Sequence, residues 1–276
     1  MLRFFQMLSI VGCALVMVGC SKKEEAETKP QPLQAIDPAT GMRPPNFVWG
    51  SERGQLVNFY FEPTDTMRLY APAMRSKAEE IYRFISQMLM YNPTVPIDMY
   101  CYHDMPTFTA HTSRTEPFMV DNKLYYGYGP AFGRPIAEYV MSRLPQGQSR
   151  FAFIREGLPV LFDFTGRNYH HAVNNFVVDG ILHPIDSLVY DAGYTQLKPT
   201  MREIEAASLC AFMLWEWGNE KFMQIYGSQE DIETTLKNVL KINPDQLYQQ
   251  WVAFLPEHTV EKEAEREKQA QPGGGQ

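Results

Sequence analysis

The spacing of apolar residues in the first half of the chain alternates between the period of a strand and that of a helix. Residues 56–61 and 95–102 are rich in β-branched and aromatic side chains, which predicts two strands. Between them, an apolar residue recurs every three or four positions up to an Asn-Pro pair, which predicts a long helix with one buried stripe. Pro72 is the expected start of this helix, and residues 123–128 form a further strand candidate.

Helical spacing prevails from residue 136 onward. Residues 136–144, 151–164 and 201–217 are predicted helices, and shorter helices are expected to follow up to residue 255. Residues 165–199 show no clear period. The pattern therefore predicts an α+β fold, in which a small N-terminal mixed sheet with helices is followed by a helical C-terminal part.

Both ends of the chain differ in composition from this central part. Residues 22–45 consist mainly of Lys, Glu, Pro, Gln and Thr, and residues 257–276 are charged and then rich in Gly. Neither segment can bury enough apolar surface to offset the conformational entropy lost on ordering. We therefore expect a disordered tether over residues 20–46, one folded domain over residues 47–256 and a disordered tail after it.

The first 19 residues have the pattern of an export signal. Arg3 precedes an apolar run that is too short to span a bilayer and is followed by a polar stretch. The run ends with MVGC at residues 17–20, which resembles the lipobox of bacterial lipoproteins except that Met17 stands where Leu is usual. The resemblance implies that residues 1–19 are a lipoprotein signal peptide and that Cys20 carries acyl chains such as palmitate. An ordinary secretory leader is the alternative.

This resemblance also implies a location and a first partner. Ser21 rather than Asp follows Cys20, which in enteric bacteria favours the outer membrane over the inner one. The expected partner is the membrane itself, through the lipid anchor, with the domain on the periplasmic side. A net charge of −7 without a recurring basic stripe excludes nucleic acid as a partner. Cys101 and Cys210 lie in apolar segments far apart and are expected to be buried free thiols.

Two short segments resemble the zinc site of the gluzincin metallopeptidases. The sequence AEYVM begins at Ala137, and FIREGLPVLFD follows at residues 153–163. In gluzincins an HExxH helix presents two zinc-binding His side chains on one face with a general-base Glu, and a second helix supplies a third ligand. The matching positions here are Ala137 and Met141 for the two His ligands, Glu138 for the base and Glu156 for the third ligand. The order of the flanking segments over residues 50–255, with PIDMYCY and YYGYG before the two helices, resembles the peptidase-MA-like domain of that family.

The resemblance implies an architecture without the usual chemistry. Ala137 offers no donor atom and the Met141 thioether suits zinc poorly, so we expect no metal and no cofactor. The chain is then a pseudoenzyme of the cell envelope that works by binding a peptide or an envelope protein. In the family the edge strand pairs with the substrate backbone, which predicts binding at Tyr125, Tyr126 and Gly127 of the strand at 123–128.

The same residues also allow other interpretations. An active zinc metallopeptidase could use relocated ligands, with His170 or His183 joining Glu138 and Glu156. Both Glu side chains could instead simply pair with Arg134 and Arg155 or with helix N-terminal amides. The tyrosines of the strand could be ordinary surface and core aromatics, and the whole chain could be a purely structural envelope lipoprotein whose old cleft is filled.

Overall fold

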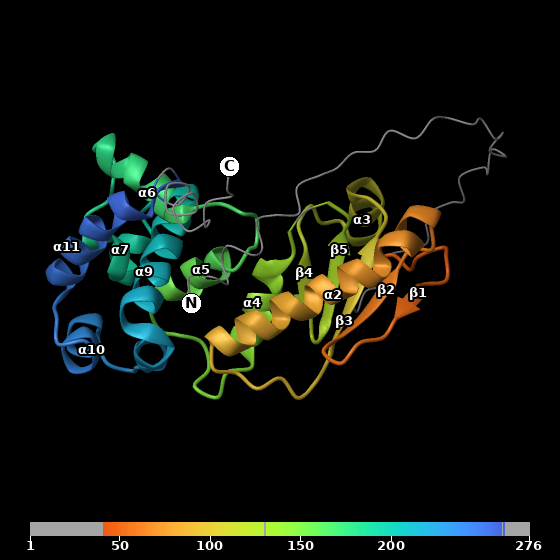
Figure 1. Ribbon diagram of the computed structural model, residues 1–276, viewed down its shortest axis with the longest axis horizontal. Coiled ribbons are helices and arrows are strands. Elements are labelled where there is room, and N and C mark those ends of the chain that lie inside the picture. Colours follow the sequence, from red (N-terminus) through yellow and green to blue (C-terminus); the bar gives the residue numbers. More distant parts are fainter. Residues whose placement is uncertain (1–40, 130, 261, 263–276) are drawn as a thin grey trace, which may run out of the picture.

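The computed structural model describes residues 41–129, 131–260 and 262 (Figure 1). The predicted signal peptide, the lipidation site at Cys20, most of the tether and residues 263–276 lie outside the described residues. None of the described helices has the length and apolar character needed to cross a bilayer.

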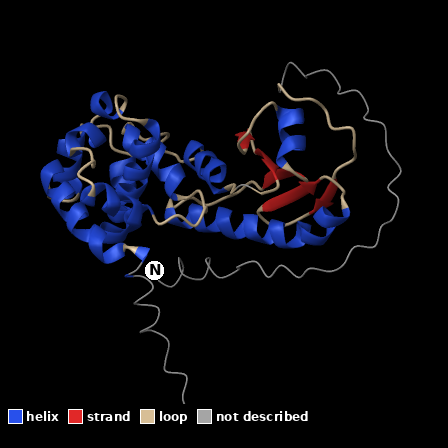
Figure 2. Ribbon diagram, turned by 90° about the horizontal axis from the view of Figure 1, so that it is seen from above, coloured by secondary structure: helices blue, strands red, loops and turns tan. Residues whose placement is uncertain are grey.

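A five-stranded mixed sheet forms the N-terminal part. Its spatial order is β1 (Gly50–Glu52), β2 (Val57–Phe61), β3 (Ile97–Tyr102), β5 (Lys123–Gly127) and β4 (Phe118–Val120). The three inner strands run parallel, and the two outer strands pair antiparallel to their neighbours. The predicted α+β class is confirmed, because the other regular elements of the described residues are helices (Figure 2).

The long helix α2 (Asp65–Met88) connects β2 to the parallel strand β3 and covers one face of the sheet. Strand β2 alternates between buried and half-buried positions, so that its core-facing side chains pack beneath the helix. The predicted start at Pro72 is wrong by two turns. Thr64 caps the helix by accepting a hydrogen bond from the Met67 amide at 3.2 Å, so Pro72 lies inside it.

The opposite face of the sheet carries a ladder of stacked aromatic rings. Tyr60, Tyr100, Tyr125 and Phe118 come from four neighbouring strands, and their ring centroids are 4.7, 5.2 and 5.3 Å apart in that order. The strand register places each ring directly opposite the next. The helix α3 (Met105–Thr112) packs on part of this face.

The C-terminal part consists of helices that pack around α9. The bounds of these helices are α4 Gly133–Ser142, α5 Ala152–Leu161, α6 Tyr169–Val178, α7 Ile185–Val189, α8 Asp191–Tyr194, α9 Pro199–Tyr226, α10 Ile232–Val239, α11 Pro244–Phe254 and the 3-10 turn η1 Leu255–His258. Helix α9 consists of two helical segments that meet at a kink at Gly218, where φ is 76° and ψ is 171°. This break confirms the predicted end of the helix at residue 217. Helices α5 and α9 approach closely at Gly157. A Cβ at this position would lie only 2.5 Å from the carbonyl carbon of Ala206.

The packed region begins before the predicted domain boundary at residue 47. The Arg43 amide donates to the His111 carbonyl at 2.8 Å, and the Arg43 guanidinium donates to the Ala110 carbonyl at 2.8 Å. Met42 is buried against the aromatic face of the sheet. At the other end, Thr259 is also buried, three residues beyond the predicted end at 256.

Candidate functional site

Helix α4 carries the positions that match the two His ligands, and both face the core. Ala137 is fully buried and Met141 is 4% exposed, and both belong to the main hydrophobic cluster. Their spacing of four residues places them on one face of the helix, as predicted. Glu138 lies away from this face, with a side chain that is 51% exposed. The residues of the HExxH-like pattern therefore do not converge on one point.

Glu138 pairs with an arginine on its own helix. The Arg134 guanidinium contacts the Glu138 carboxylate at 3.2 Å and the Glu203 carboxylate of α9 at 3.3 Å. The pKa of Arg134 is raised by these two carboxylates, even though burial acts in the opposite direction. The predicted pairing of Glu138 with Arg134 is thus confirmed, and the pair also links α4 to α9.

Glu156 pairs with an arginine that the sequence analysis did not identify. Arg202 of α9 contacts one carboxylate oxygen of Glu156 through Nε at 3.1 Å and through Nη2 at 3.0 Å. Arg155, the predicted partner, instead donates to the carbonyl groups of Ser149 and Arg150. Glu156 and Arg202 are 46 residues apart in the sequence, so no local pattern predicts that they pair.

The two predicted carboxylates are therefore connected to adjacent residues of α9, Glu156 directly and Glu138 through Arg134. Arg202 compensates Glu156, and Arg134 lies between Glu138 and Glu203. Because these side chains are partly exposed, each pair contributes only about 0.2–1 kcal/mol to stability. Arg202 thus balances the charge of Glu156, whereas Arg134 is shared between Glu138 and Glu203.

The two histidines considered as replacement ligands are bonded elsewhere. His170 on α6 lies with Nδ1 2.9 Å from the Ser208 hydroxyl, which also accepts a hydrogen bond from the Trp251 indole at 3.1 Å. His183 contacts the fully buried carboxylate of Glu205 at 2.8 Å. Burial raises the pKa of Glu205, and the hydrogen bond and charge of His183 act against that rise.

The donor set does not fit a zinc site. Zinc in proteins is bound by three or four His, Cys or carboxylate groups at about 2 Å. Across residues 41–129, 131–260 and 262, no group of three such side chains is gathered closely enough to hold a metal ion. Cys101 and Cys210 are buried free thiols, as predicted, and burial raises the pKa of each.

The predicted edge position of the strand at 123–128 is wrong. Strand β5 lies between β3 and β4. It pairs in parallel with β3 on one side and antiparallel with β4, its hairpin partner, on the other. Tyr125 is stacked within the aromatic ladder, and Tyr126 is buried with its hydroxyl oxygen accepting a bond from the Gly129 amide at 3.1 Å. Gly127 allows α3 to approach, since a Cβ there would lie 2.6 Å from the Met105 sulfur. A binding role for these three residues stays a prediction.

The edge strand on this side of the sheet is β4. It joins β5 through a two-residue turn in which Asp121 has φ 55°, a geometry that favours tight hairpins. The residues that flank such a turn, Val120 and Lys123, form a hydrogen-bonded pair, and the pairs then alternate. Met119, opposite Leu124, consequently directs its backbone N–H and C=O away from β5 toward the open edge.

Comparisons with known proteins give a distant likeness of fold. No protein-family model and no curated protein matches the chain. Among solved structures, the chain is distantly similar to native yeast LTA4 hydrolase, a gluzincin metallopeptidase, at 10% sequence identity and a TM-score of 0.42. The match covers 77% of this chain and 39% of that one, so the chain spans well under half the length of that enzyme. A likeness at this distance assigns neither activity nor ligand to the chain.

The buried imidazole of His170 predicts a loss of stability on acidification. Burial, and secondly the neighbouring His258, lower the pKa of His170 to about 3. The unfolded chain binds a proton at this residue below about pH 6.5, which the folded chain does not accept until about pH 3. The contribution of His170 to the free energy of unfolding therefore falls by at most about 1.4 kcal/mol per pH unit over this window.

We expect His170→Asn to show a shallower decline of unfolding free energy between pH 6.5 and pH 4.5 than the parent, measured by urea denaturation. The control is Ser208→Ala, which removes the hydroxyl partner but keeps the imidazole and should retain the steep decline. Parallel pH profiles for the parent and His170→Asn would contradict this account.

Proposed function

We propose that this chain is a non-catalytic binding protein of the cell envelope that holds an extended segment of another protein at the free edge of β4. A lipid on Cys20 anchors it to the membrane, and a tether carries the domain away from the surface. The observation that carries the proposal is the pairing of both motif carboxylates with arginines, in a helix pair that resembles a catalytic one.

The non-catalytic part of the proposal is supported by charge and burial. A gluzincin-type reaction needs a metal-activated water and a carboxylate free to take its proton. Here Ala137 and Met141 are packed in the core. Arg134 forms an ion pair with Glu138, and Arg202 forms one with Glu156.

The binding part of the proposal is supported by the geometry of β4. Within the described chain this strand is hydrogen-bonded on one side only, and Met119 presents an unused donor and acceptor to the other side. An extended peptide can add to such an edge by main-chain hydrogen bonds. The flanking Phe118 carries the Arg114 guanidinium 4.2 Å above its ring, which offers an aromatic and cationic contact for side chains of the added strand.

Zinc content separates this proposal from an active peptidase with relocated ligands. We expect the purified chain, dialysed against zinc and then against buffer, to retain no stoichiometric zinc by elemental analysis and to leave fluorogenic peptides uncut. The reason is that no three donor side chains converge in the described part of the chain. Stoichiometric zinc that disappears in Glu156→Gln would favour the peptidase instead.

The free edge of β4 can be tested at one backbone amide. Peptides selected from a random decapeptide display library on the full chain should lose about 10-fold or more in affinity for Met119→Pro, measured by fluorescence anisotropy. Proline removes the outward N–H without breaking a bond to β5, and edge strands tolerate it.

The matched control for this experiment is Met119→Ala, which removes the same partly buried side chain but keeps the amide. We expect its affinity to stay near that of the parent. Selected peptides that bind Met119→Pro and the parent equally well would rule out strand addition at β4.

The membrane anchor is tested separately from the domain. Metabolic labelling with a radioactive fatty acid should mark the parent and Cys13→Ser, but not Cys20→Ser, because only the second cysteine ends the lipobox-like sequence. Equal labelling of both variants would show that Cys20 is not the lipidated residue.

A further inference from the structure

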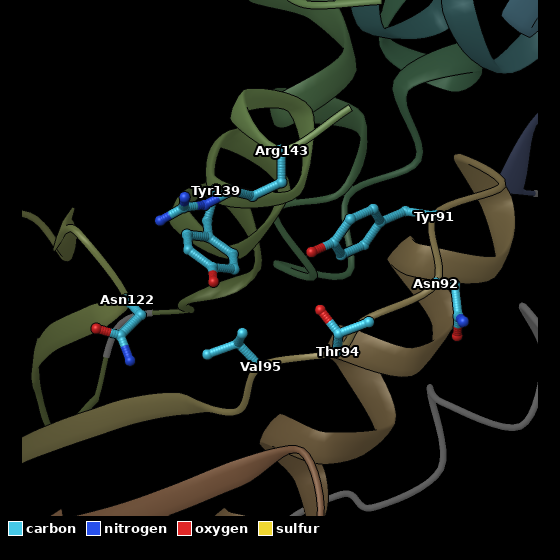
Figure 3. A pocket seen from close by; sticks show the side chains of 7 residues that line it. All are labelled: Tyr91, Asn92, Thr94, Val95, Asn122, Tyr139 and Arg143. Atoms are coloured by element: carbon cyan, nitrogen blue, oxygen red, sulfur yellow. The ribbon is translucent and has the colours of Figure 1, made fainter. Parts of the chain in front are cut away.

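A cavity of about 520 Å³ lies at the end of the sheet, and neither Glu138 nor Glu156 is among the residues that line it (Figure 3). Three parts of the chain form it: the loop between α2 and β3, the turn between β4 and β5, and the last turn of α4. Its lining residues are Tyr91, Asn92, Thr94, Val95, Asn122, Tyr139 and Arg143. The proposed peptide-binding edge does not include these side chains, and the gluzincin-like motif assigns none of them a role.

Arg143 is the one charged residue among those seven, and it forms no ion pair with any carboxylate of the described chain. Its guanidinium lies 5.1 Å from the centroid of the Tyr139 ring, which holds the cation against the cavity wall. Arg134, in the first turn of the same helix, by contrast forms ion pairs with two carboxylates. Arg143 therefore keeps its planar set of donors available for an anion from outside the protein.

The rest of the lining is uncharged and rich in hydroxyl and amide groups. Figure 3 shows the Tyr91 hydroxyl directed toward Tyr139, with Thr94 beside it and Asn122 across the cavity. The Asn122 side-chain amide donates to the Pro96 carbonyl at 3.4 Å, which fixes the orientation of its oxygen. These groups can donate to and accept from a polar ligand, and the two aromatic rings can pack against its apolar faces.

The floor of the cavity is rigid. Tyr82 of α2 is fully buried beneath it and donates its hydroxyl to the Val95 carbonyl at 3.3 Å. Its ring meets the Tyr139 ring edge-to-face at 6.2 Å. Burial and the nearby Tyr139 and Tyr91 hydroxyls raise the pKa of Tyr82, so this floor stays uncharged and does not offset Arg143.

We propose that this cavity binds a small ligand in which a carboxylate stands next to hydroxyl or amide groups, with Arg143 pairing to the carboxylate. A sugar acid and the C-terminus of a short peptide share this chemistry, and both fit a cavity of this size. The cavity is separate from the β4 edge. The result of the test below therefore neither supports nor contradicts the proposed peptide binding at that edge.

Ligand-observed saturation-transfer NMR on the purified full chain provides the test. The probes are D-glucuronate with D-glucose as its neutral counterpart, and acetyl-Ala-Ala with its C-terminal amide as the second pair. At least one acid should bind at millimolar concentration, and about 10-fold or more tightly than its neutral counterpart. The acid that binds more tightly identifies the source of the carboxylate.

Variants at two arginines make the result specific to the cavity. Arg143→Ala should weaken binding of the preferred acid by about 10-fold or more, and Arg143→Lys should lie between it and the parent, because lysine cannot pair with both carboxylate oxygens in the same way. The control is Arg83→Ala, at an exposed arginine of α2 that does not line the cavity, which should bind as the parent does. Binding of neither acid to the parent, or equal binding to the parent and Arg143→Ala, would overturn the proposal.

Discussion

The close approach of α5 and α9 sets the geometry on which the candidate site depends. Only glycine at position 157 allows it, since a Cβ there would press on the backbone of Ala206. The approach brings the beginning of α9 alongside α4 and α5, so that Arg202 and Glu203 reach Glu156 and Arg134. A packing contact in the core thus decides the electrostatics of residues that lie nearer the surface.

Two ion pairs connect the motif helices α4 and α5 to α9. In this chain, Arg134 connects α4 to α9, and Arg202 connects α5 to α9. Buried apolar side chains, including Ala137 and Met141, also hold α4 in place. Arg134 and Glu156 are therefore part of the contacts between helices.

The hairpin of β4 and β5 contributes to both of the proposed binding surfaces. Its outer strand offers the Met119 backbone, and its turn supplies Asn122 to the cavity of Arg143. The aromatic ladder holds this hairpin to the inner strands by ring stacking from Phe118 to Tyr60.

The sequence by itself determined the elements whose signal is local. Apolar periodicity was enough to predict the α+β class. The spacing of four residues placed Ala137 and Met141 on one face of α4, and it placed Glu138 within reach of Arg134, which was one of the partners considered for it. Tertiary structure alone decided the contacts between distant segments. The partner of Glu156 is Arg202, because α9 packs on α5. Strand β5 is an inner strand because β4 pairs with its outer side, and β4 is too short to show an alternating pattern in the sequence. Spacing along a chain reports which side chains share a face, whereas only packing reports what that face meets.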